Sequence, residues 1–296
     1  MIGRVLYIVV GIGAFLSLLG ILQYFNVLYN GWWSHKHFLS ATYVNHNHFS
    51  GYLELVMPVL ITIWISKKHI LGLSSVLLLM ITILIVTAFL YSQSLGAWIS
   101  LFISFIVMNL VIVKNPLYRK RMFFVSFGMI LIILILLMLN KVNMVPIDFY
   151  MTGLEAKEPS FRMRIAIWKG AMRMIREQSL FGVGLGTFRW GFLRFKPSGL
   201  INTIYYAHND YLHIITECGI IPVIIFIGMI SKIIKQSFSN YRNNILLLGC
   251  GVGILSISLH SLVDFNFHIP ANMFLFVVYA AFIMRGEKLN MEENND

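Results

Sequence analysis

The sequence predicts an all-α polytopic membrane protein, and three observations lead to that prediction. Charged residues make up 12% of the 296 residues and hydrophobic residues make up 58%, whereas a soluble domain carries about 25% charged residues. The apolar runs approach twenty residues, which is the length that crosses a bilayer as a helix. These runs lack the alternation of polar and apolar residues that a membrane β-barrel requires, and a helix satisfies its own backbone groups within lipid.

Long apolar runs divide the chain into about eight expected transmembrane helices. The first run is too long for the core of a signal peptide, and no small-x-small cleavage site follows it, so we interpret it as a retained span. The whole chain, residues 1–296, is therefore expected to form a single integral membrane domain. The expected spans cover residues 5–28, 51–66, 70–91, 95–113, 122–140, 211–231, 245–262 and 271–284.

Basic residues alternate between the connections in a way that indicates topology. With Arg4 and the N-terminus in the cytoplasm, the short inside loops are basic, and the short outside loops hold Lys36 and almost no other Lys or Arg. Cytoplasmic loops carry such an excess of Lys and Arg, so both termini are expected inside. The inside connections contribute Lys67, Lys68, Lys114, Arg119, Lys120, Arg121, Lys232, Lys235, Arg242, Arg285 and Lys288.

The connection at residues 141–210 breaks this pattern. It holds ten Lys and Arg against five Asp and Glu, yet the order of spans makes it one long extracytoplasmic loop. Long loops are translocated largely regardless of charge, so the charge needs another reason. A basic surface suits an anionic ligand such as a diphosphate, and a solvated basic helix beside anionic headgroups is the alternative. Nucleic acid is not expected as a partner, because loop topology explains a basic membrane protein.

An amphipathic helix is expected within this loop over residues 161–178, starting near Pro159. Its apolar residues recur at intervals of three and four, which is the period of one helix face. Such a helix would lie along the membrane surface with its tryptophan at headgroup level. The expected apolar face consists of Ile165, Trp168, Met172 and Ile175.

A glycine-rich run with Gly182, Gly184 and Gly186 follows this helix. A dinucleotide-binding loop needs a strand before it and a helix after it, and here an amphipathic helix precedes the run. We therefore expect a turn whose backbone approaches a ligand or a neighbouring helix.

His208 stands directly before the sixth expected span, at the outer boundary of the membrane. An imidazole there could accept a proton near neutral pH, and a hydrogen-bonded interfacial histidine is the alternative. Asp210, His213 and Glu217 share one face of the same span. Charged groups inside a membrane normally face a bundle interior or a water-filled cavity, so Glu217 is expected to be buried, with either a structural or a catalytic role.

A second polar patch lies at the outer end of the seventh expected span. His260 and Asp264 are four residues apart, and Asn266 and His268 follow just beyond. We expect Asp264 either to orient His208 or an arginine, or to face water at the helix end.

The first outside loop is rich in histidine and asparagine. Its four histidines raise the question of zinc, but no cysteine accompanies them and their spacing matches no zinc motif, so no metal is expected. Asn45 and Asn47 are better candidates for contacts to polar sugar groups. The four histidines are His35, His37, His46 and His48.

Taken in order, these pieces resemble the O-antigen ligase family, which includes lipopolysaccharide O-antigen ligases and related polysaccharide polymerases. The resemblance runs from about residue 40 to the C-terminus. It rests on Asn45-His46-Asn47 before an apolar helix with Pro58, on Arg164-Ile165-Ala166-Ile167-Trp168, on Phe181-Gly182-Val183-Gly184, on His208-Asn209-Asp210-Tyr211-Leu212 with Glu217-Cys218-Gly219, and on Asp264 with Pro270.

The resemblance implies metal-independent glycosyl transfer, without a cofactor, at the outer face of the bacterial cytoplasmic membrane. The donor would be a glycan on undecaprenyl diphosphate, and the acceptor would be a hydroxyl of a glycan, a lipid or a protein. His208 would take the proton from that hydroxyl, and Arg164 would bind the departing diphosphate. Further substrate contacts are expected from Arg162, Arg173, Arg189, Asn45, Asn47, Asn209, Glu217 and Asp264.

Two features depart from the family pattern. Leu95 stands where family members often have an arginine that also serves the diphosphate, so Arg162, Arg189 or Arg194 would have to supply a second cation. One span precedes Asn45, where the family usually has several, which is expected of a shortened member, of a fragment or of a chain with a partner subunit.

Other functions could use the same basic surface. A polysaccharide polymerase would take the same lipid-linked donor as a ligase. A transporter or flippase would bind the anionic lipid-linked substrate without chemistry, but transporters often show internal repeats and helices broken at mid-membrane depth, and neither is evident here. A non-catalytic accessory subunit would account for Leu95 and for the smaller number of spans.

Overall fold

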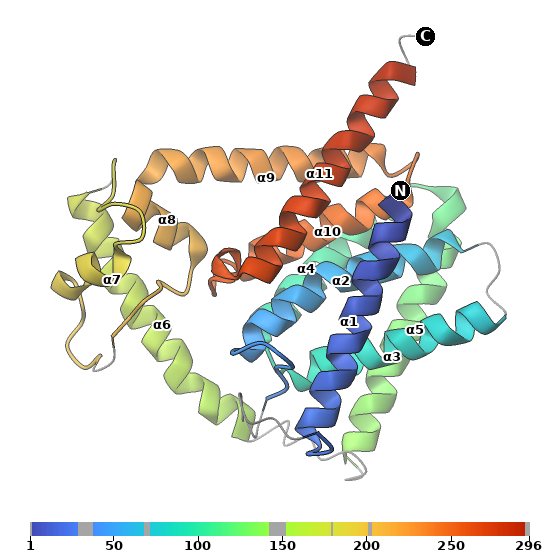
Figure 1. The fold of residues 1–296 in the computed structure, drawn as a ribbon, viewed down its shortest axis with the longest axis horizontal. Helices are drawn as coiled ribbons and strands as arrows, with labels where there is room; N and C mark the ends of the chain where they lie inside the picture. The colour runs from blue at the N-terminus through green and yellow to red at the C-terminus, as the bar shows by residue number, and fades with distance from the viewer. Residues whose placement is uncertain are drawn as a thin grey trace.

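The structure is a computed structural model that describes residues 2–28, 38–67, 72–141, 152–178, 180–200 and 203–293. Within these residues every regular element is helical, which confirms the expected all-α fold of a polytopic membrane protein. Figure 1 shows the helices in chain order. They are α1 (Ile2–Tyr24), α2 (His46–Ser66), α3 (Leu73–Tyr91), α4 (Leu95–Ile112), α5 (Pro116–Lys141), α6 (Thr152–Glu177), α7 (Phe188–Gly191), α8 (Asp210–Cys218), α9 (Ile220–Asn240), α10 (Ile245–His260) and α11 (Pro270–Glu293), with short 3₁₀ helices η1 (Phe192–Arg194) and η2 (Asn266–His268).

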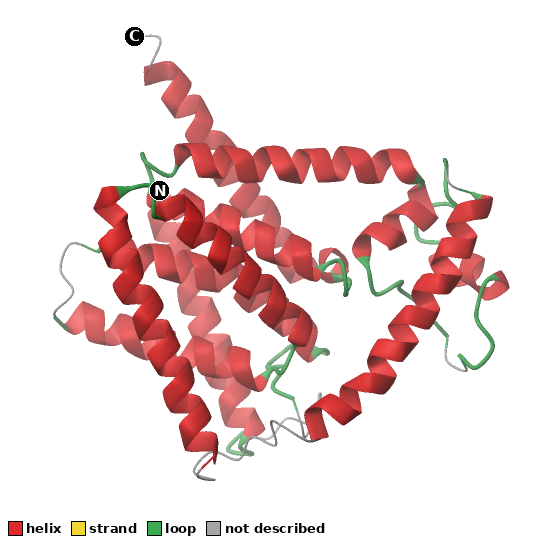
Figure 2. Cartoon of the chain, turned by 180° about the vertical axis from the view of Figure 1, so that it is seen from behind, coloured by secondary structure: helices red, strands yellow, loops and turns green. Residues whose placement is uncertain are grey.

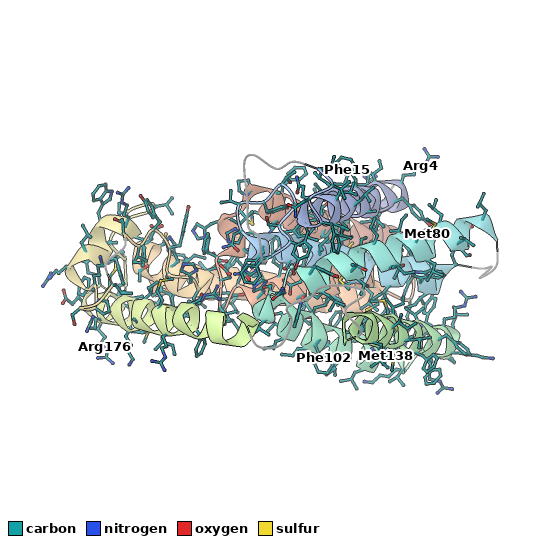
Figure 3. All side chains as sticks on the ribbon, turned by 90° about the horizontal axis from the view of Figure 1, so that it is seen from below. Arg4, Phe15, Met80, Phe102, Met138 and Arg176 are labelled. Carbon is teal, nitrogen blue, oxygen red and sulfur yellow. The ribbon has the colours of Figure 1, made fainter. Side chains whose placement is uncertain are left out.

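Among the described helices, α1, α2, α3, α4 and α9 are long and apolar enough to cross a membrane, and α10 and the first part of α11 are shorter apolar helices. The expected span at 122–140 lies inside α5. Large apolar side chains point outward around the bundle, as Figure 3 shows for Phe15, Met80 and Phe102. These three are 64%, 62% and 65% exposed in the chain itself. Such a surface fits lipid, because the bilayer rather than water covers it.

Helix α2 forms the centre of the bundle, and α10 packs closely against it. Almost every residue of α2 from His48 onward is buried. Helix α10 offers glycines on the facing side. A Cβ atom at Gly249 would lie 2.5 Å from the Thr62 hydroxyl, and one at Gly253 would lie 3.1 Å from the Leu55 carbonyl oxygen. Small residues at a membrane helix interface allow this close approach of two backbones.

The expected sixth span, residues 211–231, is wrong as a single helix. The chain forms α8 up to Cys218 and starts the new helix α9 at Ile220, and Figure 1 shows the two helices turning away from each other. Gly219 between them has a φ of 87°, and a Cβ atom there would lie against the Leu180 carbonyl oxygen. Glycine alone adopts this left-handed backbone without a steric cost. Apolar residues lie on both sides of Gly219, so hydropathy joined the two helices into one expected span.

The expected amphipathic helix exists as α6, but it starts at Thr152, well before Pro159. Residues 154–158, Leu-Glu-Ala-Lys-Glu, are strong helix formers that extend it towards the N-terminus. Its buried stripe is Ile167, Ala171 and Met174 rather than the predicted face, whose Met172 is exposed. Figure 2 shows α6 extending past the edge of the bundle towards α7 and α8. The stripe packs on Phe188 and Phe192 of that region, which a pattern based on large residues alone did not reveal.

Several element ends converge beside α6. The turn between α3 and α4 contacts the start of α2, because the His46 ring nitrogen Nδ1 lies 2.6 Å from the Ser92 carbonyl oxygen. The segment after α10 contacts α6 through Val263, and the segment before α8 contacts α6 through Ala207. The polar residues singled out in the sequence lie at this end of the bundle.

Candidate active site

Asp264, just after α10, is the carboxylate around which the candidate site is built. Its Oδ2 atom lies 3.1 Å from Nη2 of Arg164 on α6. Its Oδ1 atom accepts a hydrogen bond from the Phe265 backbone N–H at 2.9 Å. The same Oδ1 lies 3.6 Å from Nε2 of His48 on α2 and 3.8 Å from Nδ1 of His208. One buried carboxylate therefore joins side chains from three separate parts of the chain.

The environment of Asp264 keeps this carboxyl group ionised. Burial alone raises its pKa, but the neighbouring rings of His208 and His48 and the charge of Arg164 outweigh burial and hold the pKa well below its usual range. An opposite charge and nearby polar groups that can point hydrogens at the carboxylate favour the charged form of a buried acid in this way. The site therefore contains a fixed negative charge at neutral pH.

Some N–H groups of the Arg164 guanidinium have hydrogen-bond partners within the protein, and others have none. It donates from Nη1 to the Val263 carbonyl oxygen and from Nη2 to Asp264. Its Nε is buried and has no hydrogen-bond partner. A guanidinium has five N–H donors in a planar fork, so two contacts fix the group and leave donors for a ligand.

His208 has a backbone φ of 49°, which a non-glycine residue rarely adopts. The indole N–H of Trp168 lies 3.0 Å from the Ala207 carbonyl oxygen and 3.3 Å from the His208 carbonyl oxygen, and so holds this segment against α6. Trp168 follows Arg164 by four residues, so both project from one face of the helix. A single helix face thus positions the backbone of His208 and the guanidinium beside Asp264.

A cavity of about 420 Å³ opens beside Arg164 and Trp168, between α6 and the starts of α2 and α4. Its lining combines apolar and aromatic side chains with a few polar groups, which is typical of sites for organic ligands. Leu95 forms part of the wall, at the position where the family arginine was expected. The lining residues are Phe38, His46, Asn47, Gln93, Leu95, Gly96, Ile99, Ser160, Phe161, Arg164, Trp168 and Val263.

Glu217 lies away from this cavity and organises the glycine-rich run. Its carboxylate accepts hydrogen bonds from the backbone N–H groups of Gly186 and Phe188, both at 2.9 Å. Its backbone carbonyl accepts another from Gly184. A Cβ atom at Gly182, where φ is 66°, would meet the Glu217 backbone at 2.4 Å. The run is thus a turn packed on a neighbouring helix, and all the contacts described for Glu217 are structural.

Asn45 and Asn209 act as helix caps. The Asn45 side chain accepts the backbone N–H of Asn47 at the start of α2. The Asn209 side chain accepts the N–H of Leu212 at the start of α8 and donates to the Leu262 carbonyl oxygen. A capping side chain that satisfies the first helical N–H groups is a common structural role. Asn47, in contrast, lines the cavity.

The other predicted arginines lie outside the Asp264 cluster. Arg173 donates to a backbone carbonyl in the region of η1, at 2.7 Å. Arg189 lies over two aromatic rings, 4.5 and 4.8 Å from their centroids. Arg194 pairs with Glu177 at the surface. Arg162 is exposed on α6 and does not line the cavity. Of the predicted cations, Arg164 alone is among the cavity residues.

Two histidines make carboxylate contacts that the sequence analysis did not predict. His48 faces Asp264, and its backbone carbonyl accepts a hydrogen bond from Asn272. His268 lies 2.6 Å from the buried carboxylate of Asp210 through its Nδ1 atom. In the sequence, His48 appeared as one of four loop histidines. Its place directly after the Asn-His-Asn piece, on the first turn of a buried helix, was the available signal.

The histidine-rich loop is only partly described, because His35 and His37 lie outside the described residues. His46 and His48 face different partners, Ser92 and Asp264. No group of three metal-binding side chains forms within the described part of the chain.

Comparison with protein families gives a match over half of the chain. A family model described as O-Antigen ligase matches residues 78–227. The matched segment contains Leu95, Arg164 and His208 and ends before Asp264. Among curated proteins, none matches this chain.

Proposed function

The chain belongs to the O-antigen ligase family, and from that premise we propose that it transfers a glycan from undecaprenyl diphosphate to an acceptor hydroxyl. In this proposal the reaction takes place at the outer face of the bacterial cytoplasmic membrane, with both termini in the cytoplasm. The distribution of Lys and Arg between the short loops supports this orientation.

The observation that carries the proposal is the buried carboxylate shared by a cation and an imidazole. Arg164 contacts Asp264 at 3.1 Å and lines the cavity, and His208 approaches the same carboxylate at 3.8 Å from outside the cavity lining. Buried polar atoms of native proteins are nearly always paired. Three unpaired ones gather here, namely Arg164 Nε, His208 Nδ1 and His48 Nε2. This concentration supports a ligand-binding role over a purely structural one.

The chemistry follows from the groups in place. His208 takes the proton of the acceptor hydroxyl through Nε2, while Asp264 favours the tautomer that carries its hydrogen on Nδ1. The acceptor oxygen forms a bond to the anomeric carbon of the donor sugar. The bond between that carbon and the diphosphate oxygen breaks, and its electron pair leaves with the lipid diphosphate. The separation of 3.8 Å is too long for a hydrogen bond and tightens when substrate is bound.

Arg164 stabilises the charge that grows on the departing diphosphate. Arginine binds phosphate oxygens through paired N–H groups of its fork. Donors held in place before the reaction require no reorganisation as the charge develops. Asp264 acts as a positioning residue, because it fixes the guanidinium on one side and leaves the other side to the cavity.

A substitution of His208 tests the proposal. His208→Asn removes the base, and asparagine adopts a left-handed backbone more readily than most residues, so the local fold should persist. We expect transfer in membranes supplied with lipid-linked donor to fall by about 10²-fold or more, with unchanged membrane insertion. Transfer at the wild-type rate would contradict the assignment of the base.

The product separates the related activities. A polymer attached to a new acceptor indicates ligation, and a ladder of chain lengths indicates polymerisation. Flux of the donor across liposomes without any transfer would instead support a transporter.

A further inference from the structure

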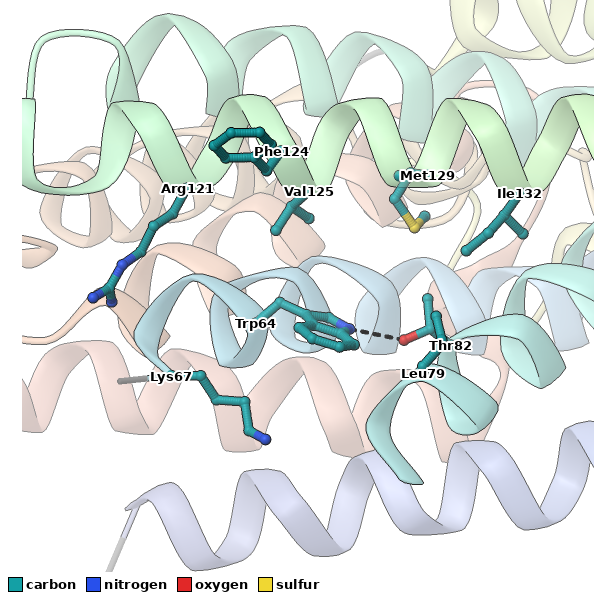
Figure 4. A pocket seen from close by; sticks show the side chains of 10 residues that line it. Trp64, Lys67, Leu79, Thr82, Arg121, Phe124, Val125, Met129 and Ile132 are labelled. Carbon is teal, nitrogen blue, oxygen red and sulfur yellow. Dashed lines mark hydrogen bonds between the residues drawn. The ribbon is translucent and has the colours of Figure 1, made fainter. Parts of the chain in front are cut away.

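A second cavity, of about 200 Å³, lies between α2, α3 and α5, away from the Asp264 cluster (Figure 4). Its walls are mostly apolar and include Leu79, Phe124, Met129 and Ile132. Two cations, Lys67 and Arg121, belong to the same lining. Figure 4 shows these cations towards one end of the cavity and Met129 and Ile132 towards the other.

This cavity belongs to the opposite side of the membrane from the candidate active site. His48, beside Asp264, lies in the first turn of α2, and Lys67 directly follows its last residue. At 1.5 Å per residue the helix separates the two by about 28 Å, which is close to the roughly 30 Å of a bilayer core. In the proposed orientation the cations lie at the cytoplasmic surface.

The two cations have only neutral partners among the described side chains. Lys67 donates to the hydroxyls of Ser74 and Ser75 at 3.0 and 2.7 Å. Arg121 donates to the backbone carbonyl of Ile65 at 2.9 Å. No ion pair with a carboxylate forms for either cation in the part of the chain that the structure describes. Two positive charges beside an apolar cavity therefore favour an anionic group.

The cavity opens towards lipid rather than towards the protein core. Leu79 and Phe124 of its lining are 43% and 56% exposed in the isolated chain. Its inner side is fixed by the hydrogen bond from the Trp64 indole N–H to the Thr82 hydroxyl, at 2.9 Å. This arrangement provides a slot that can hold a hydrocarbon chain, with cations where a headgroup would lie.

We propose that this cavity binds an anionic phospholipid of the bilayer. Its phosphate contacts Arg121 and Lys67, and one acyl chain lies between α3 and α5. Basic pockets between transmembrane helices on the cytoplasmic side suit anionic headgroups. Arg121 also contacts the last turn of α2, where a cation is favoured. Lys67, the C-cap residue of α2, shares that role, but the role leaves the apolar slot unexplained.

Gly128 offers a substitution that fills the cavity without disturbing the fold. It lines the cavity within α5, and a Cβ atom there meets no heavy atom within 4 Å. Gly128→Leu places a side chain in the slot and leaves both cations intact. Gly228→Leu in α9 is the matched control, because a Cβ atom there also meets open space and Gly228 does not line the cavity.

The measurement is native mass spectrometry of the full chain in detergent, titrated with phosphatidylglycerol or phosphatidylcholine. We expect wild type and Gly228→Leu to retain phosphatidylglycerol in preference to phosphatidylcholine, and Gly128→Leu to lose it. Lys67→Gln and Arg121→Gln should each weaken phosphatidylglycerol binding about fivefold.

Two results would overturn the proposal. The first is a loss of specificity or of dependence on the cavity. Gly128→Leu would then retain phosphatidylglycerol at the wild-type level, or wild type would bind phosphatidylcholine as tightly as phosphatidylglycerol. The other is binding that depends on Gly128 but is shown by polyprenyl phosphate and not by phosphatidylglycerol.

Discussion

Asp264→Asn tests the central feature of the site. The asparagine keeps the shape of the side chain and can still accept the Phe265 N–H, but it removes the charge that faces Arg164. Asp264 is fully buried and the Arg164 side chain is 16% exposed, so solvent screens this pair weakly. Breaking a buried pair costs roughly 3–5 kcal/mol, because the remaining charge loses its partner. The lower end corresponds to a drop in Tm of roughly 6–12 °C.

The assay is thermal unfolding of the purified protein, at one scan rate for all variants. Glu177→Gln is the matched control. It breaks the pair with Arg194, in which the two side chains are 46% and 76% exposed, and such surface pairs contribute little. A Tm of Asp264→Asn within the range of that control would refute the view that this carboxylate holds the site together.

The lowered pKa of Asp264 adds a pH dependence with a defined sign. In the unfolded chain the carboxyl group protonates near its usual pKa of about 3.9, and in the folded protein it protonates at a lower pH. Its contribution to stability is therefore complete above about pH 4 and is lost as the pH falls through the folded pKa. The gap in Tm between wild type and Asp264→Asn should stay constant from pH 7 to pH 5 and narrow in stronger acid.

Three further substitutions give separate tests. Leu95→Arg places a second cation in the wall of the cavity, and we expect the KM for the lipid-linked donor to fall about fivefold, whereas Leu95→Met should leave it unchanged. Gly182→Ala should lower Tm more than Gly186→Ala, because both residues have positive φ but only the first would meet neighbouring backbone. His268→Gln should leave transfer within about fivefold of wild type. A loss of about 10²-fold or more would move the role of base to His268, which is held by Asp210.

The sequence was sufficient for the class of fold and for the end of the bundle where the polar residues gather. Apolar runs near twenty residues have no stable form in lipid other than helices. The ordered motifs singled out Arg164, His208 and Asp264, and the structure places these three together. Their distances and the role of His48 depend on how α2, α6 and α10 pack, which no local pattern specifies.

Other features were hidden because small residues decide them. The break at Gly219 lies inside the expected span 211–231, two residues after Glu217, and it is set by a close approach to the Leu180 carbonyl oxygen. The buried face of α6 is determined by Gly170, which admits the neighbouring Phe192 ring, and by the buried Ala171 beside it. Hydropathy gives weight to large apolar residues, so it selected the face with Met172. In both places the smallest side chain, which lets a neighbouring segment come closest, determined the packing, and the most apolar side chain did not.

The pairing of Arg164 with Asp264 has a consequence for how the site would bind a diphosphate. An arginine neutralised by a carboxylate adds little net positive charge, so long-range attraction of a diphosphate must come from the other basic residues of the 141–210 segment.

Arg164 instead contributes N–H donors that are held in a fixed orientation. Two of its donors are fixed on Val263 and Asp264, and its buried Nε still has no partner. A lysine would offer one point charge, and that charge would be taken up by Asp264. The planar fork lets one residue bind its positioning carboxylate and a leaving group at the same time, which explains why an arginine fits this place in the site.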